Sequence, residues 1–233
     1  FDCAEECVVI RFVTGNAKKL REVTAILEDC GLPLPMEQMD LDLDELQSES
    51  PEKIAAAKCA LAAEITGGPV LVDDTSLCLE ALGGCPGPYV KWFCGPDKRP
   101  DIFARMLDGF EDKRAYATSC VAFAVGPKTV PLVFTGRVDG AIVEPSKGGV
   151  GWDNSFRPDG EELTFAEMSL EHKNLISHRS KALHNLSAYL HQHKDLLVRL
   201  CGDYQTEPAA QQVAQTTTPL SPPRSLSSSS SSS

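Results

Sequence analysis

The stretch that decides the fold is Val8-Val9-Ile10-Arg11-Phe12-Val13, followed by Thr14-Gly15-Asn16-Ala17-Lys18-Lys19. The first six residues are mostly β-branched and apolar, which predicts a buried strand. The strand breaks at Gly15, and a helical period follows. That helix would bury a face made of Leu20, Val23, Ile26 and Leu27. A strand that enters a helix through a glycine turn is typical of α/β proteins.

Further helices and strands follow this opening unit. A second helix is predicted from Ser50-Pro51, a good cap followed by Pro at the first helical position. We also expect a short strand over 70–72, a helix over 101–107, strands over 116–125 and 130–143 with a turn around Gly136, and a long helix over 170–197. The apolar stripes would contain Ile54, Leu61, Ala62 and Ile65 in the second helix, and Leu175, Ala182, Leu183, Leu186 and Leu190 in the last. This order predicts a mixed-sheet α/β protein.

The composition divides the 233 residues into three parts. We expect residues 1–7 to form an N-terminal extension, residues 8–200 to form one functional domain, and residues 201–233 to form a Ser/Thr/Pro-rich tail. The tail has too few apolar residues to offset the entropy of ordering, so we expect it to be disordered. Apolar runs of roughly 20 residues, as a membrane helix needs, are missing from the sequence, so we expect no membrane partner.

The net charge bears on possible partners, and the cysteines bear on the cellular compartment. The net charge of −11 and the pI near 4.9 disfavour a nucleic-acid partner, because an acidic surface repels a phosphate backbone. The nine cysteines contain no CxxC pair, and residues 1–7 show no secretory signal. We therefore expect reduced cysteines and a cytoplasmic protein.

The loop of residues 14–19 is the first candidate site. It lies between a strand and a helix, where free helix amides and the helix dipole favour an anion. Lys18 and Lys19 add positive charge, so phosphate is the expected ligand, although the Walker A spacing is absent. An ordinary turn with solvated lysines is the alternative.

Asp73-Asp74-Thr75 follows the predicted strand over 70–72 and forms the second candidate site. Ligands of α/β sheets bind outside the carboxyl ends of strands. Two carboxylates there suit Mg²⁺, which binds through one or two carboxylates and substrate phosphates. Asp44 and Glu45 could supply a further carboxylate. The alternatives are a helix N-cap pair and a solvated loop.

Two cations interrupt apolar helix faces. Lys58 follows Ile54 by four residues, and Arg179 lies between Leu175 and Ala182. Each side chain could snorkel at the rim of the core. Together with the other two candidates they favour a shared anionic site, in which a triphosphate–metal complex would compensate their charge.

These motifs, with two glycine-rich loops, resemble one family. The resemblance rests on Val13-Thr14-Gly15-Asn16-Ala17-Lys18-Lys19, Val72-Asp73-Asp74-Thr75, Ala81-Leu82-Gly83-Gly84 through Pro86-Gly87-Pro88-Tyr89 with Lys91-Trp92, Gly151-Trp152-Asp153 and Ser177-His178-Arg179. In this order they resemble the inosine triphosphate pyrophosphatases. The resemblance implies an elongated two-lobed mixed-sheet fold with the active site in the cleft between lobes, and a homodimer. It implies hydrolysis of ITP, dITP and XTP to the monophosphate and pyrophosphate with Mg²⁺, for which Mn²⁺ could substitute.

The resemblance also implies roles for individual residues. Thr14, Gly15, Asn16, Ala17, Lys18 and Lys19 would hold phosphates, and Lys58, Asp74, Thr75, Lys91 and Lys173 would give further substrate contacts. Val150, Gly151, Trp152, Asp153, His178 and Arg179 would line the base pocket, with Val150 where the family usually has Phe. Glu45 and Asp74 would bind the metal, and Asp74 would also activate water.

Two other functions stay open at this point. A related pyrophosphatase of the Maf-like type would act on dTTP or UTP, and a non-catalytic nucleotide-binding module would keep the pocket without turnover. The side chain that reads the purine six-position oxygen is also open, with Asp153 and Arg179 as candidates.

Overall fold

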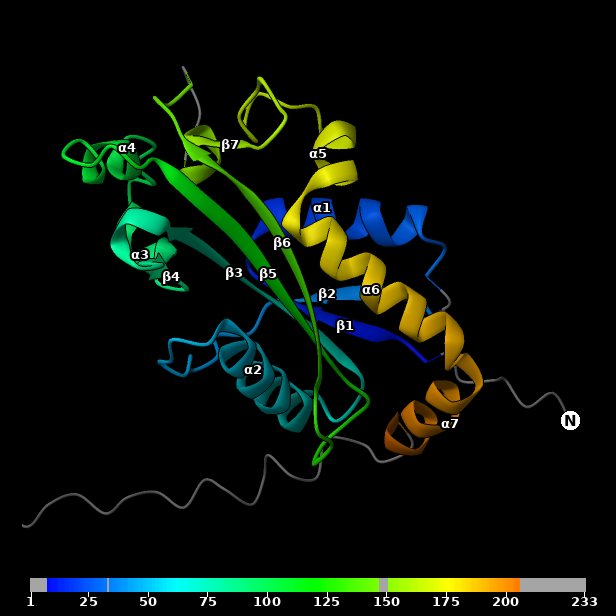
Figure 1. The fold of residues 1–233 in the computed structure, drawn as a ribbon. Coiled ribbons are helices and arrows are strands. Elements are labelled where there is room, and N and C mark those ends of the chain that lie inside the picture. The colour runs from blue at the N-terminus through cyan, green and yellow to red at the C-terminus, as the bar shows by residue number, and fades with distance from the viewer. Residues whose placement is uncertain (1–7, 33, 147–150, 206–233) are drawn as a thin grey trace, which may run out of the picture.

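A computed structural model describes residues 8–32, 34–146 and 151–205 of the chain (Figure 1). The elements in chain order are β1 (Ile10–Val13), α1 (Ala17–Asp29), β2 (Met36–Met39), α2 (Pro51–Thr66), β3 (Val70–Leu79), η1 (Glu80–Leu82), β4 (Pro86–Gly87), α3 (Val90–Cys94), α4 (Ile102–Met106), β5 (Arg114–Ala124), β6 (Leu132–Ile142), η2 (Trp152–Asn154), β7 (Phe156–Pro158), α5 (Leu170–Ile176), α6 (His178–Gln192) and α7 (Lys194–Gln205).

The strands form one mixed sheet, which has seven strands within the described part of the chain. Their order is β2-β1-β3-β5-β6-β7, and β4 pairs with β3. β1 is parallel to β2 and β3, whereas the β3–β5, β5–β6, β6–β7 and β3–β4 pairs are antiparallel. This arrangement confirms the predicted mixed-sheet α/β class.

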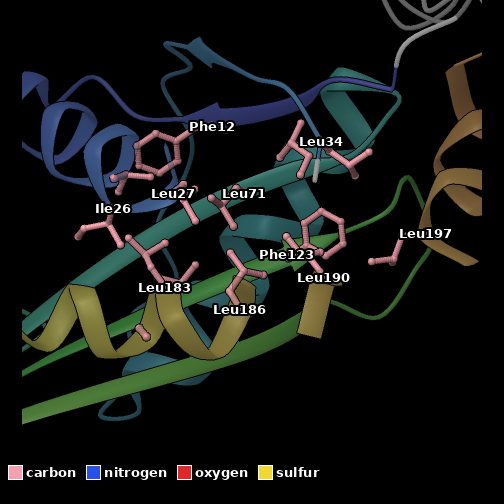
Figure 2. Packing of buried hydrophobic residues seen from close by; sticks show 14 of the residues in the cluster. Phe12, Ile26, Leu27, Leu34, Leu71, Phe123, Leu183, Leu186, Leu190 and Leu197 are labelled. Carbon is pink, nitrogen blue, oxygen red and sulfur yellow. The ribbon is translucent and has the colours of Figure 1, made fainter. Parts of the chain in front are cut away.

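Helices cover the two faces of the sheet differently. Figure 1 shows α1 and α6 on one side of the long strands β3, β5 and β6, and α2 on the other. The first face carries the large core shown in Figure 2, in which Phe12, Leu71 and Phe123 of the sheet pack against Leu27 of α1 and Leu183 of α6. The predicted apolar face of α1 is confirmed, since its buried residues include Val23, Ile26 and Leu27.

The buried face of α2 agrees with the prediction at Ile54 and Ala62 and differs from it at Leu61 and Ile65. Ala55, Cys59 and Ala63 pack against the sheet, whereas Leu61 and Ile65 are exposed. Small side chains let the helix backbone approach the sheet closely, so they take the inner face although Leu and Ile are more hydrophobic. Lys58 therefore lies at the edge of the buried face rather than in its middle.

A separate core occupies the other end of the long strands. There α3, α4 and β7 gather (Figure 1), and Leu77 and Leu79 of β3 pack with Phe103, Leu107 and Phe156. The polar residues of β3 lie between this core and the one in Figure 2. Hydrophobic packing at both ends of the long strands, with a polar stretch between, agrees with the expected two-lobed fold.

The expected end of the third strand at Val72 is wrong. β3 continues to Leu79, so that Asp73, Asp74 and Thr75 lie within the strand rather than after it. The reason is non-local, because β5 pairs with every residue of β3 from Val70 to Leu79. The backbone groups are satisfied by this ladder whatever side chains they carry.

The expected turn around Gly136 is also wrong, since Gly136 lies inside β6. A Cβ there would lie 2.1 Å from the carbonyl oxygen of His178 and 2.6 Å from the amide nitrogen of Ala182. This glycine therefore lets α6 approach the sheet.

The predicted long helix over 170–197 is three helices instead of one. Ser177 is extended, and its side chain accepts a hydrogen bond from the Ser180 amide as the cap of α6. Because of the break, Leu175 on α5 is exposed and does not continue the apolar stripe of α6. α7 reaches Gln205, five residues beyond the predicted domain boundary at 200. Within the described ranges, every helix is too short or too polar to cross a membrane.

Candidate active site

The candidate site centres on two neighbouring carboxylates in the middle of β3. Successive side chains of a strand point to opposite faces, so Asp73 and Asp74 face different surroundings. Asp73 faces α6, and Asp74 lies on the side that carries α2. This alternation corrects the expectation of a carboxylate pair that binds one Mg²⁺ together.

Asp73 is engaged by cations of the protein itself. Its Oδ2 lies 3.0 Å from Nη2 of Arg179 and 3.0 Å from Nζ of Lys19, and the hydroxyl of Ser119 donates to its Oδ1. Burial alone would raise the pKa of Asp73, but Arg179 and Lys19 hold it far below its ordinary value. Asp73 is therefore a permanently charged anchor for Arg179 and Lys19.

Asp74 has the opposite character. Its Oδ2 is buried and has no hydrogen-bond partner among the described residues. Burial is the main cause that raises the pKa of Asp74 to about 6, and the neighbouring charges of Asp73 and Glu45 raise it further, while Lys19 and Lys58 lower it. An unpaired carboxylate with such a pKa can take a proton or hold a cation near neutral pH.

Glu45 and two lysines lie close to Asp74. Nζ of Lys58 donates to Oε1 of Glu45 at 2.7 Å, and the Glu45 side chain is 38% exposed. Burial raises the pKa of Glu45, but Lys58, Lys91 and Lys19 lower it more, so the net shift is downward. The structure thus brings Glu45, Lys19 and Lys58 together around Asp74, and Lys91 acts on Glu45.

Glu45 and Asp74 are the two carboxylates of this group that could hold a divalent cation. In the described ranges no group of three or more His, Cys, Asp or Glu side chains could enclose a metal ion. Two carboxylates, one of them with an unpartnered buried oxygen, fit a cation such as Mg²⁺ that takes its other ligands from water and phosphate.

The predicted phosphate loop adjoins this group. Its residues from Gly15 to Lys18 are exposed, and Asn16 caps α1 by accepting from the amides of Lys18 and Lys19 at 3.0 and 3.2 Å. Two of the amides expected to hold an anion are therefore bonded within the loop. A Cβ at Gly15 would lie 2.7 Å from Oδ1 of Asp40, so the glycine permits this close approach.

A buried ionic network continues from Asp73 on the α6 side. Lys173 lies 2.9 Å from Glu22 and 2.7 Å from Asp153, Lys18 also pairs with Asp153, and Arg179 pairs with Glu22. Burial alone would raise the pKa of Asp153, but Lys173 and Lys18 hold it far below its ordinary value. Arg179 needs no triphosphate to compensate its charge, which corrects the sequence argument, because Glu22 and Asp73 do so.

Aromatic rings flank His178 next to this network. The rings of Trp152 and Phe165 have centroids 5.6 and 5.7 Å from that of His178, and neither nitrogen of His178 has a partner among the described residues. Burial, reinforced by Arg179 and Lys173, lowers the pKa of His178 well below its usual value, so the imidazole is neutral. Gly151 precedes Trp152 with a φ of +75°. The predicted contact Val150 lies outside the described residues.

Thr75 contacts the ionic network, since its hydroxyl accepts a hydrogen bond from Nη2 of Arg179 at 3.0 Å. Sequence reasoning missed Glu22, Ser119 and Phe165. Glu22 had a usable signal, because it interrupts the buried face of α1 just as Arg179 interrupts that of α6. Ser119 and Phe165 had none, since a serine in a strand and a phenylalanine in a loop are ordinary core residues.

Comparison with known proteins identifies the family. The model of the Ham1 family matches residues 10–189. The chain belongs to the Ham1 family. The resemblance inferred from the motifs is thus confirmed.

Solved structures of similar proteins support the same conclusion. A HAM1 protein from Coxiella burnetii is 28% identical, with a TM-score of 0.68 over 79% of this chain and 99% of that one. The Staphylococcus aureus Ham1 protein is 26% identical, with a TM-score of 0.64 over 79% and 99%. A nucleoside-triphosphatase (dITP/XTP pyrophosphatase) from Mycobacterium abscessus is 30% identical, with a TM-score of 0.60 over 78% and 99%.

Proposed function

We propose that this Ham1-family chain is a nucleoside triphosphate pyrophosphohydrolase. It hydrolyses ITP, dITP and XTP to the monophosphate and pyrophosphate, and so removes non-standard purine nucleotides. The observation that carries the proposal is Asp74, whose Oδ2 is buried without a partner in the described chain and whose pKa is raised to about 6. Lys19 and Lys58 lower the pKa of both Asp74 and Glu45, so positive charge lies close to this carboxyl group. The similarity to a dITP/XTP pyrophosphatase supports the substrate class.

In this proposal Asp74 orients a water molecule toward the α-phosphorus and accepts its proton. Lys19, Lys58 and Lys91 stabilise the negative charge that develops on the departing pyrophosphate. Lys19 is held in place by Asp73, with Nζ 2.8 Å from its carbonyl oxygen and 3.0 Å from its carboxylate. The proton leaves the attacking water, and the bond from the α-phosphorus to the bridging oxygen breaks.

Glu45 and Asp74 would hold the divalent cation, Mg²⁺ or Mn²⁺. When bound, the cation neutralises charge on the phosphates. Lys58 favours the charged form of the Glu45 carboxylate, to which its Nζ donates a hydrogen bond.

The base would lie against Trp152 and His178. Asp153 and Arg179 are both engaged by charged side chains of the protein, whereas the two nitrogens of His178 have no partner in the described chain. A neutral imidazole offers one donor and one acceptor, which suits the six-position oxygen and neighbouring N–H of hypoxanthine. Adenine would present an amino group to the same donor, and such a mismatch rejects a substrate strongly.

We also propose a homodimer in the cytoplasm. The described cysteines at positions 30, 59, 78, 85, 94, 120 and 201 are all unpaired, which suits a reducing compartment.

The test is hydrolysis of ITP, XTP, ATP, GTP and dTTP with Mg²⁺, with nucleotide and phosphate products resolved. We expect fast conversion of ITP and XTP to the monophosphate plus pyrophosphate, and little turnover of ATP. Preference for dTTP would place the chain with a Maf-like activity. Tight ITP binding without turnover would make it a nucleotide-binding module, and release of single phosphates would contradict attack at the α-phosphorus.

A further inference from the structure

Three buried oxygens without protein partners lie together on the α2 side of the sheet. They are Oδ2 of Asp74, Oγ of Ser76 and Oγ1 of Thr118. Ser76 follows Asp74 by two residues on β3, and Thr118 on β5 is the register partner of Ser76. Neither hydroxyl belongs to the motifs from which the site was predicted.

The register fixes this placement. β3 and β5 pair without interruption from Val70 to Leu79, so the alternation of side chains is regular. Alternate residues share a face and lie about 6.8 Å apart, and directly opposite Cβ atoms lie about 4.5–5.5 Å apart. Val72 and Cys120 pack against α2, which places Asp74, Ser76 and Thr118 on that same face.

A buried hydroxyl that makes no hydrogen bond destabilises the fold, so these oxygens require a partner. Ser76 is fully buried. A hydroxyl can donate and accept, whereas an ionised carboxylate only accepts. The partner must therefore bring donors to Asp74 while tolerating hydroxyls beside it, which water bound to a cation does.

We propose that Ser76 and Thr118 form an outer shell of the divalent-cation site, with their hydroxyl oxygens accepting hydrogen bonds from waters bound to the cation. The inference rests on the proposed function, because it takes Asp74 as a ligand. Mg²⁺ keeps several of its waters when one or two carboxylates hold it, so those waters need acceptors in the protein. Ser76 and Thr118 are positioning residues, since they act through the cation's waters.

The test is a titration of the nucleotide-free protein with Mn²⁺. The electron paramagnetic resonance signal of free Mn²⁺ measures how much of the ion is bound. Loss of partners around metal ligands weakens metal affinity by about 10–100-fold, so we expect a weakening of at least about 10-fold in the S76A/T118V double variant. Thr118→Ser keeps the hydroxyl and should bind Mn²⁺ as the unaltered protein does. Thr66→Val is the matched control. The Oγ1 of Thr66 is also buried without a partner in the described chain, but Thr66 is the last residue of α2 and is not part of the sheet.

Several results would overturn the inference. One is unchanged Mn²⁺ affinity in the double variant, and another is an equal loss in T118S and T118V, which would indicate packing. A similar loss in T66V would show a general effect of buried hydroxyls. If S76A fails to fold, shown by thermal melting, the comparison of T118V with T118S decides alone.

Asp74→Asn separates this inference from the proposed metal site. If D74N binds Mn²⁺ as tightly as the unaltered protein, Asp74 is no ligand and both assignments fail. If D74N loses Mn²⁺ while the double variant keeps it, only the outer shell fails.

Discussion

Asp73 and Asp74 are neighbours on β3, but their side chains have opposite surroundings. Asp73 is surrounded by Arg179, Lys19 and Ser119, whereas one oxygen of Asp74 has no partner in the described chain. The difference arises from the alternation of the strand, which turns one carboxylate to the cations of α1 and α6 and the other to the candidate cation site. The two aspartates should therefore respond differently to substitution.

Asp74→Asn should lower kcat for ITP by about 100-fold or more, since general-base assistance contributes about 10²–10⁴-fold. Its fold should persist. The raised pKa means that the folded state favours protonated Asp74, so ionisation destabilises the fold as pH rises through about 6. At pH 8 the variant should melt at the same temperature as the unaltered protein or higher. Near-normal turnover would refute the assignment.

The pH dependence of kcat/KM follows from the same group. The active form is the carboxylate, so activity at low cation concentration should fall about tenfold per pH unit below about pH 6. Raising Mg²⁺ should move this limb to lower pH, because a cation favours the ionised form. Initial rates between pH 4.5 and 8 check this, and a flat profile down to pH 4.5 at low Mg²⁺ would contradict it.

Asp73→Asn should instead reduce stability. Removal of one partner from a buried ion pair costs about 3–5 kcal/mol. Here it leaves Lys19 without its carboxylate partner and leaves Arg179 with Glu22 alone. The pKa of Asp73 is depressed, so its contribution is present above the ordinary aspartate pKa and is lost only in strong acid. Urea unfolding at pH 7 measures the loss. Asp139→Asn breaks an exposed pair with Arg137 and should cost less than about 1 kcal/mol, and equal losses would contradict the account.

At the scale of elements, the approach of α6 to β6 positions His178 and Arg179. Gly136 lies where the two elements touch, and the atoms that its Cβ would meet are mostly backbone, which cannot move aside as a side chain can. The position of the site thus depends on a glycine that belongs to none of the site motifs.

Gly136→Ala should lower stability by about 3 kcal/mol, the upper range for overpacking, and raise KM by displacing His178. Denaturant unfolding and steady-state kinetics measure the two effects. Gly109→Ala is the control, since no heavy atom lies within 4 Å of its Cβ position. Similar behaviour of the two variants would show that α6 does not depend on this contact.

At the scale of the whole molecule, the sequence predicted local features and missed the non-local ones. The opening strand and α1 were predictable because their hydrophobic periods are strong. The length of β3 was not, because Asp73-Asp74 interrupts an apolar run and only the ladder with β5 extends the strand through it. The motifs contain most of the candidate site residues. They do not show that Asp153 is paired with Lys173 and that Arg179 is paired with Glu22.

In the proposed mechanism water attacks the α-phosphorus of a purine nucleoside triphosphate. Hydrolysis of ITP in ¹⁸O-labelled water, with mass spectrometry of both products, identifies the phosphorus that is attacked. We expect one ¹⁸O atom in IMP and none in pyrophosphate. Label in pyrophosphate or in orthophosphate would show attack at another phosphorus and would contradict the mechanism.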